Sequence, residues 1–268
     1  MSRGLLSGRI IPKICREPGM TETRKSVPKR LKKEPLVEAV CEIRFTSDRE
    51  SVAELLPGLI YKAMGAEFPK IERLPVADLP SAFIQQDAKL RYVPTVRLEG
   101  NPYSIQIGEH VVSLSCRRPY TGWGNFNSKI MELAEVLKET ALITQPERFS
   151  LRYIDIIPLN ESPSLKPLRV KMKLGTHELT SNHVQLRTEL HENGFLHIVQ
   201  IVSPAQAVLS TGERFDGLLL DVDTICQRGP GEFWSDFRPL LDRAHQLNKI
   251  LFFQLLTAET INWLEPEY

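Results

Sequence analysis

The sequence lacks the features that mark several large classes of protein. It has no run of about 18 apolar residues, so a transmembrane helix is not expected. Its four cysteines include no C-x-x-C pair, which argues against a zinc ribbon or a dithiol redox centre. It contains no G-x-S-x-G, H-E-x-x-H or P-loop motif. Serine hydrolysis, zinc-dependent proteolysis and nucleoside triphosphate hydrolysis therefore have no motif support, and no cofactor is expected.

The amino-acid composition is that of an ordinary globular protein. The chain has 268 residues, of which 42% are hydrophobic and 25% charged, which suffices for one large domain or two small ones. Cys41, Cys116 and Cys226 lie in or beside apolar runs, as reduced and buried cysteines do. We therefore expect a cytoplasmic protein that does not act at a membrane.

Charge is balanced only over the whole chain. Residues 1–35 carry ten Lys or Arg against three acids, whereas the remaining residues carry 24 basic and 30 acidic side chains. A basic arm could contact nucleic acid, but a body with a net charge of −6 does not predict a nucleic-acid-binding domain. We expect residues 1–34 to be a disordered, solvated leader, with nucleic-acid contact limited to it.

The first nineteen residues are a separate question. They are basic and loosely resemble a mitochondrial transit peptide, but they lack the apolar core and cleavage site of a secretory signal. Alternatively, translation starts at Met20, which opens an ordinary polar preamble. We favour Met20 and leave both alternatives open.

The pattern of apolar residues predicts an α+β fold with a mainly antiparallel sheet. Residues 35–45 alternate with a period of two, as in a half-buried strand, and further strands are expected at 83–86, 91–98, 103–107, 111–116, 149–158, 168–174, 183–190, 195–202 and 216–225. Asn193-Gly194 indicates a tight hairpin. Helical spacing predicts a helix that Asp48 or Ser51 caps and that runs to about Lys62, and further helices over residues 128–140 and 232–249. Residues 250–256 fit either a continued helix or a closing strand.

Two segments of the chain share a sequence of elements. In each, a strand containing a cysteine is followed by a basic turn, a Trp-x-x-Phe motif (Trp123 and Phe126, Trp234 and Phe237) and a long helix. This predicts two duplicated strand-strand-helix halves, 35–158 and 168–268, packed as one unit, with both tryptophans buried. Coincidence remains an alternative, because residues three apart share one helix face in any case.

Three motifs resemble a known family. The chain resembles a sporadically distributed prokaryotic protein family whose members have about 250 residues. The resemblance lies in the opening motif P-L-V-E-x-x-x-E-I-R-F (35–45), the segment 151–157 and the closing segment 252–267. No established biochemical function is attached to that family. Its scattered distribution implies transferable cargo such as defence or toxin–antitoxin components.

Two groups of residues could carry chemistry. Asp221 and Asp223 share one face of a strand, as carboxylates that hold a divalent metal do, although a strand with apolar inward residues would also place both in water. Arg117, Arg118, Tyr120 and Trp123 interleave basic and aromatic side chains, as in single-strand nucleic-acid binders, although a strand-exit turn with a core Trp has the same pattern.

The sequence therefore favours a non-enzymatic, cytoplasmic component that binds another protein through a sheet edge or a helix groove. An antitoxin-like, immunity or chaperone-like role fits this interpretation. The alternative is a metal-dependent enzyme that acts on nucleotides or phosphoesters through Asp221 and Asp223. The sequence does not predict an oligomeric state.

Overall fold

The computed structural model describes residues 27–49, 51–79, 90–208, 212–227 and 233–268. The expectations for residues 1–26 and for a strand at 83–86 lie outside the described residues. Among the described residues, no helix combines the length and the apolar character needed to cross a membrane.

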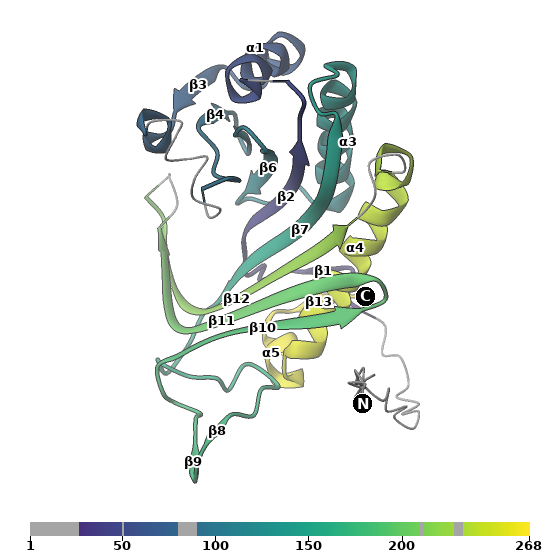
Figure 1. Ribbon diagram of the computed structural model, residues 1–268. Helices are drawn as coiled ribbons and strands as arrows, with labels where there is room; N and C mark the ends of the chain where they lie inside the picture. The colour runs from purple at the N-terminus through teal and green to yellow at the C-terminus, as the bar shows by residue number, and fades with distance from the viewer. Residues whose placement is uncertain (1–26, 50, 80–89, 209–211, 228–232) are drawn as a thin grey trace, which may run out of the picture.

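A nine-stranded antiparallel sheet forms the centre of the protein (Figure 1). Its strand order is β10-β11-β12-β7-β2-β6-β5-β4-β3, and the predicted α+β class is confirmed. The strands are β2 (Leu36–Thr46), β3 (Lys70–Arg73), β4 (Val96–Glu99), β5 (Tyr103–Ile107), β6 (Val111–Arg117), β7 (Gln145–Ile157), β10 (Val184–Glu192), β11 (Phe195–Val208) and β12 (Arg214–Gln227).

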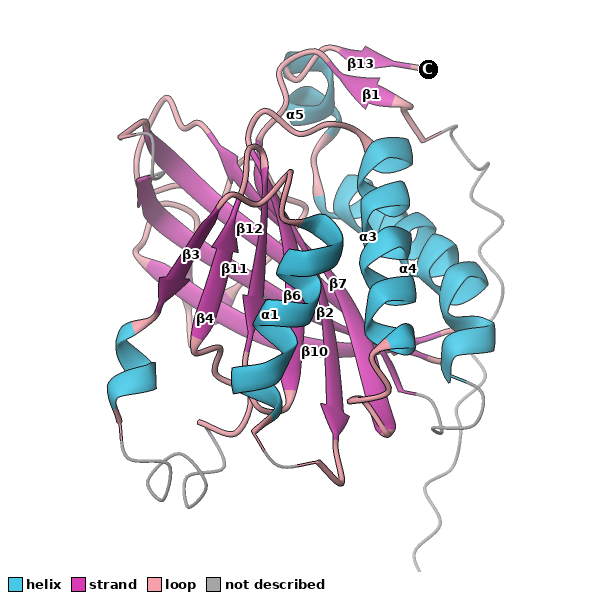
Figure 2. Ribbon diagram, turned by 90° about the horizontal axis from the view of Figure 1, so that it is seen from above, coloured by secondary structure: helices cyan, strands magenta, loops and turns pink. Residues whose placement is uncertain are grey.

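Three long helices lie on one face of this sheet (Figure 2). They are α1 (Val52–Met64), α3 (Trp123–Glu139) and α4 (Phe233–Leu255), and a short 3-10 helix, η1 (Pro75–Asp78), follows β3. The period-two pattern of β2 explains the arrangement, because Ala39, Cys41, Ile43 and Phe45 all point toward the helices and are buried with them. Residues 250–255 continue α4, which settles the ambiguity in favour of helix.

The start of α1 differs from the prediction. Ser51 occupies the N-cap position but has a left-handed backbone, and its side chain makes no capping hydrogen bond. The Glu109 carboxylate accepts from the backbone N–H groups of Val52 and Ala53 instead, at 3.1 and 3.0 Å. The cap therefore comes from the β5–β6 turn, where a carboxylate also opposes the positive end of the helix dipole.

Other predicted strands are shorter or absent. Only the end of the 91–98 segment joins the sheet, as β4, and most of 168–174 is loop, with β8 (Lys173–Leu174) pairing with β9 (His177–Glu178). The Asn193-Gly194 turn is confirmed: both residues have positive φ, and Glu192 pairs with Phe195 across it.

The two halves of the sheet have the same strand order when β7, which the expected boundary at residue 158 assigns to the first half, is counted with the second. In the first, β2 lies next to β6, which leads outward to β5 and β4; in the second, β7 lies next to β12, which leads outward to β11 and β10. β6 precedes α3 and β12 precedes α4, and β2 and β7 pair antiparallel at the centre. A duplication of one strand-and-helix unit would produce this repeated arrangement. The duplication itself stays a prediction.

The tryptophans of the repeated motif are half-buried, so they are less enclosed than expected. The fully buried anchors are the phenylalanines three residues later, Phe126 at 0% and Phe237 at 1% exposure. Each helix thus enters the core through Phe, and its Trp lies at the margin.

The expected disordered leader ends earlier than residue 34. Arg30–Leu31 form β1, which pairs with β13 (Pro266–Glu267) after the short helix α5 (Ala258–Trp263). Leu31 is buried in a second hydrophobic cluster, separate from the core beneath α1 and α3, which it shares with Leu251, Phe252 and Leu256 at the end of α4. Apolar burial of one side chain and pairing with the C-terminal segment therefore order this part of the chain next to α4.

Candidate binding pocket

The structure places Asp221 and Asp223 on the helix-free face of the sheet, on β12. Asp221 is 2% exposed, and Arg152 on β7 binds both of its carboxylate oxygens, from Nε at 2.8 Å and from Nη2. The expectation that it faces water is wrong, because a guanidinium fork on the neighbouring strand compensates its charge.

Asp223 lies two residues further along the same face. Burial raises the pKa of its carboxyl. The Ser150 hydroxyl and the guanidinium groups of Arg152 and Arg148 oppose this shift, because each lowers the pKa. Within the described ranges, no three His, Cys, Asp or Glu side chains are grouped so that they could hold a metal ion. Asp221 belongs to a row of ion pairs on this face, in which Arg148 and Arg44 bind Glu42.

The four basic and aromatic candidates separate into two pairs. Arg117 forms an ion pair with Glu99, and Arg118 donates to the main-chain oxygen of Glu34 while its guanidinium lies 5.0 Å from the Phe215 ring centroid. Both arginines therefore have partners within the chain. Tyr120 and Trp123, in contrast, line a pocket.

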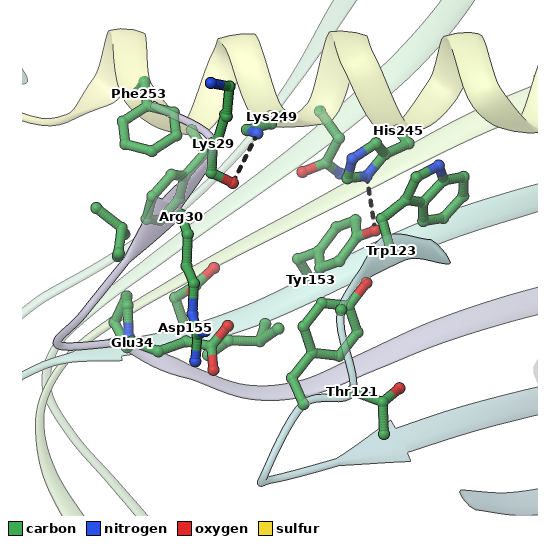
Figure 3. A pocket seen from close by; sticks show the side chains of 17 residues that line it. Lys29, Arg30, Glu34, Thr121, Trp123, Tyr153, Asp155, His245, Lys249 and Phe253 are labelled. Atoms are coloured by element: carbon green, nitrogen blue, oxygen red, sulfur yellow. Dashed lines mark hydrogen bonds between the residues drawn. The ribbon is translucent and has the colours of Figure 1, made fainter. Parts of the chain in front are cut away.

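This pocket encloses about 380 Å³ beside the C-terminal half of α4 (Figure 3). Its walls come from residues 29–36, the turn before α3, the end of β7 and α4. Such a volume lies in the range of small-ligand sites. Figure 3 shows Trp123 and His245 at one side and Glu34 with Asp155 at the other.

The aromatic side of the pocket is held by specific contacts. Trp123 stacks on His245 with a ring-centroid distance of 4.1 Å and an interplanar angle of 3°, and its Nε1–H donates to Asp242. The Tyr153 hydroxyl lies 2.9 Å from His245 Nδ1, and the Tyr120 ring packs edge-on against Tyr153. The sheet, α3 and α4 therefore fix the aromatic groups in one arrangement.

Enclosure sets the protonation of these groups. Burial, reinforced by Lys249, lowers the pKa of His245 to about 4, so the ring is neutral at neutral pH. Burial also raises the pKa of the Tyr120 and Tyr153 hydroxyls, which stay protonated. A neutral His245 can therefore accept a hydrogen bond at Nδ1 from the Tyr153 hydroxyl. The Tyr120 hydroxyl is buried beside the Tyr153 hydroxyl, which opposes the rise in its pKa.

Asp155 supplies a carboxyl at the other side of the pocket. It is 5% exposed, and no hydrogen bond or ion pair reaches it from the described part of the chain. Burial raises its pKa well above the usual range, and the nearby Glu34 and Asp221 carboxylates raise it further. Burial also raises the pKa of Glu34, although Arg30 and Arg118 oppose that shift. Among the described residues, no cation opposes the raised pKa of Asp155.

Lysines border the pocket next to α4. Lys249 Nζ donates to the main-chain oxygen of Lys29 at 3.2 Å, and Lys29 Nζ donates to that of Tyr268 at 3.0 Å. Burial lowers the pKa of Lys249. These two side chains tie β1 and the C-terminal residue to α4 and so hold the wall of the pocket in place.

Sequence reasoning identified Tyr120 and Trp123 but missed Asp155 and His245. A signal for Asp155 was available, because it follows Leu151 and Tyr153 at the inward phase of an apolar strand, where a carboxyl is unusual. No comparable signal marked His245, since only the fold brings it to Trp123.

A comparison of the chain with protein-family models and with curated proteins finds no match.

Proposed function

We propose that the protein is a non-catalytic binding component that recognises another protein by receiving one of its basic side chains in the pocket. The observation that carries the proposal is Asp155, a buried carboxyl without a cation at one side of an aromatic pocket. Buried carboxylates in proteins are normally paired, so a Lys or Arg side chain from outside would complete this site.

The aromatic rings support the same class of ligand. A cation within reach of tyrosine or tryptophan faces gains electrostatic energy, and the side chain's methylene groups can pack on Tyr120 and Tyr153. Arg30 and Arg118 lower the pKa of Glu34, whereas no cation among the described residues opposes the raised pKa of Asp155. A cytoplasmic antitoxin-like, immunity or chaperone-like component would have this kind of site, and the family resemblance adds no activity to it.

The alternative, a metal-dependent enzyme that uses Asp221 and Asp223, gains no support from the geometry. Arg152 occupies both oxygens of Asp221, and no third acidic side chain completes a metal site among the described residues.

The test uses two small probes with the same four-carbon side chain, Nα-acetyl-lysine methylamide, which carries a terminal ammonium group, and Nα-acetyl-norleucine methylamide, which lacks it. Saturation-transfer NMR and Trp fluorescence should show tighter binding of the lysine probe by about tenfold or more, as a desolvated charge pair gives. Asp155→Asn should abolish that preference. Asp223→Asn, which changes a half-buried carboxyl on the opposite face of the same sheet, is the matched control and should keep it.

The pH dependence of binding separates a charged Asp155 from a neutral one. Because the pKa of Asp155 is raised, its carboxyl loses its charge as pH falls through that pKa, and affinity for the lysine probe should fall with it. Asp155→Asn should give a flat profile. Equal binding of the two probes at every pH would refute the proposal.

A further inference from the structure

The two edges of the sheet are protected to different degrees. β3 is four residues long, contains Lys70 and lies between Pro69 and Pro75, features that prevent strand pairing. β10 has nine residues, no proline or lysine, and a continuous register with β11 from Val184 to Glu192. No strand of the described chain pairs with its outer side (Figure 1). Such an edge is open to another strand.

The hairpin determines which groups of β10 point outward. In a two-residue turn, the flanking pair, here Glu192 and Phe195, exchanges both main-chain hydrogen bonds. Hydrogen bonding then alternates along the strand, so the odd-numbered residues 185–191 direct their N–H and C=O groups to the open edge. Their side chains share the helix-free face, on which Arg187 and Glu189 form an ion pair at 2.8 Å.

The sequence of β10 is self-complementary about its midpoint, Thr188. We propose that β10 pairs antiparallel with β10 of a second copy of this chain, with the two-fold axis at Thr188. Arg187 of each copy then faces Glu189 of the other, and Leu186 faces Leu190, which is 40% exposed in the single chain. Both kinds of cross-strand pair are favourable. In this register the odd-numbered residues 185–191 of one copy lie opposite the odd-numbered residues of the other, so their outward N–H and C=O groups can form hydrogen bonds with each other.

Other positions of the axis fit less well. An axis at Arg187 places the two Arg187 side chains opposite each other, and an axis at Glu189 does the same for the acids. Axes nearer either end leave part of the nine-residue strand unpaired. The axis at Thr188 uses the whole strand and joins the two sheets into one, a closed isologous contact.

Cysteine cross-linking tests the register. Thr188 would face its own copy as a non-hydrogen-bonded pair with Cα atoms about 4.5 Å apart, a separation that a disulfide spans. Mild oxidation of Thr188→Cys should give a covalent dimer of twice 30.5 kDa. Gln185→Cys and the unmodified chain, under the same conditions, should stay uncross-linked. Equal cross-linking of Gln185→Cys would overturn the register.

Charge exchange tests the contact without a cross-link. Sedimentation velocity over a concentration series should show a monomer–dimer equilibrium. Arg187→Glu and Glu189→Arg should each weaken it by about tenfold, and the double exchange should restore it, since opposite charges again face each other. Glu189→Pro should abolish the dimer, because it removes an outward N–H and leaves the ladder with β11 intact.

The far-UV spectrum and melting temperature of each variant verify that the monomer is folded. A monomer at all concentrations, or a dimer indifferent to these changes, would overturn the inference. Asp155→Asn should leave the dimer unchanged, so failure here and failure of the proposed pocket are separate results.

Discussion

The indole of Trp123, at the first residue of α3, lies parallel to the imidazole of His245 on α4, with ring centroids 4.1 Å apart. Asp242, one turn before His245, accepts hydrogen bonds from Trp123 Nε1 and from Asn127. This contact joins the two helices at the border of the pocket. It also encloses His245, and enclosure is the main reason why its pKa is lowered.

The stability of the protein should therefore depend on the protonation of His245. Its pKa falls from 6.5 in the unfolded chain to about 4 in the folded one, so the unfolded state binds more protons between these values. This contribution is fully present above pH 6.5 and is lost as pH falls toward 4. It amounts to about 3 kcal/mol at the ordinary linkage of 1.36 kcal/mol per pKa unit.

The measurement is urea unfolding at pH 7 and pH 4.5 for the unmodified chain, His245→Phe and His191→Phe. Asp155 acts oppositely: its pKa is raised, so its contribution increases stability as pH falls. The comparison with His245→Phe isolates the histidine, because Asp155 is present in both chains. His191 lies exposed at the end of β10 and should change nothing. An unchanged pH dependence in His245→Phe would contradict the prediction.

A second prediction concerns the cap of α1. Glu109→Ala should reduce the free energy of unfolding by about 1 kcal/mol, because it leaves the N–H groups of Val52 and Ala53 without their acceptor. Ser51→Ala should have almost no effect, since the Ser51 hydroxyl makes no capping bond. Chemical denaturation measures both changes. A larger loss from Ser51→Ala than from Glu109→Ala would show that the local cap is the one that matters.

The strands and helices show which parts of the fold the sequence could predict. The period-two and helical patterns located β2, β5, β6 and all three long helices, because burial on one face sets those periods. The cap of α1 could not be predicted, since Glu109 is 57 residues away from Val52. The end of α4 was undecided for a related reason: residues 250–255 are apolar in any conformation, and the position of the second hydrophobic cluster makes them helical.

The pocket was less predictable than the sheet. Tyr120 and Trp123 stood out because aromatic and basic residues alternate there, yet the structure directs the arginines away from them. Asp221 and Asp223 were correctly placed on one face, but their partner Arg152 is 69 residues from Asp221. The ion pair forms only because β7 and β12 are neighbours, and strand order is not written in the local sequence.

The Trp-x-x-Phe motifs give a third prediction. Phe237 is 1% exposed and packs edge-on against Phe149 with a centroid distance of 5.1 Å, whereas Trp234 is half-buried beside Phe233. Phe237→Ala should cost about 4 kcal/mol, within the range of large-to-small core changes. Trp234→Ala should cost about 2 kcal/mol, since less of its surface leaves water. Thermal and urea unfolding give both values, and a costlier Trp234→Ala would contradict this order.

The last prediction concerns Asn248, which lies on the buried side of α4 and is 2% exposed. Its amide nitrogen donates to the main-chain oxygen of Val222 at 2.9 Å and to Thr224 Oγ1 at 3.0 Å, and so ties α4 to β12. Asn248→Asp keeps the shape but replaces the donor by a carboxylate that faces these acceptors. The loss of the donor and the burial of a charge should cost about 3 kcal/mol.

Asn248→Leu separates the two causes. It removes the donor without adding charge, and it should cost about 1–3 kcal/mol, the price of leaving a buried acceptor unpaired. The difference between the two variants should shrink as pH falls, because the introduced carboxyl is then protonated and can donate again to Val222. Unfolding curves at pH 7 and pH 5 measure this. If Asn248→Asp were as stable as the unmodified chain at pH 7, these hydrogen bonds would not hold α4 on the sheet.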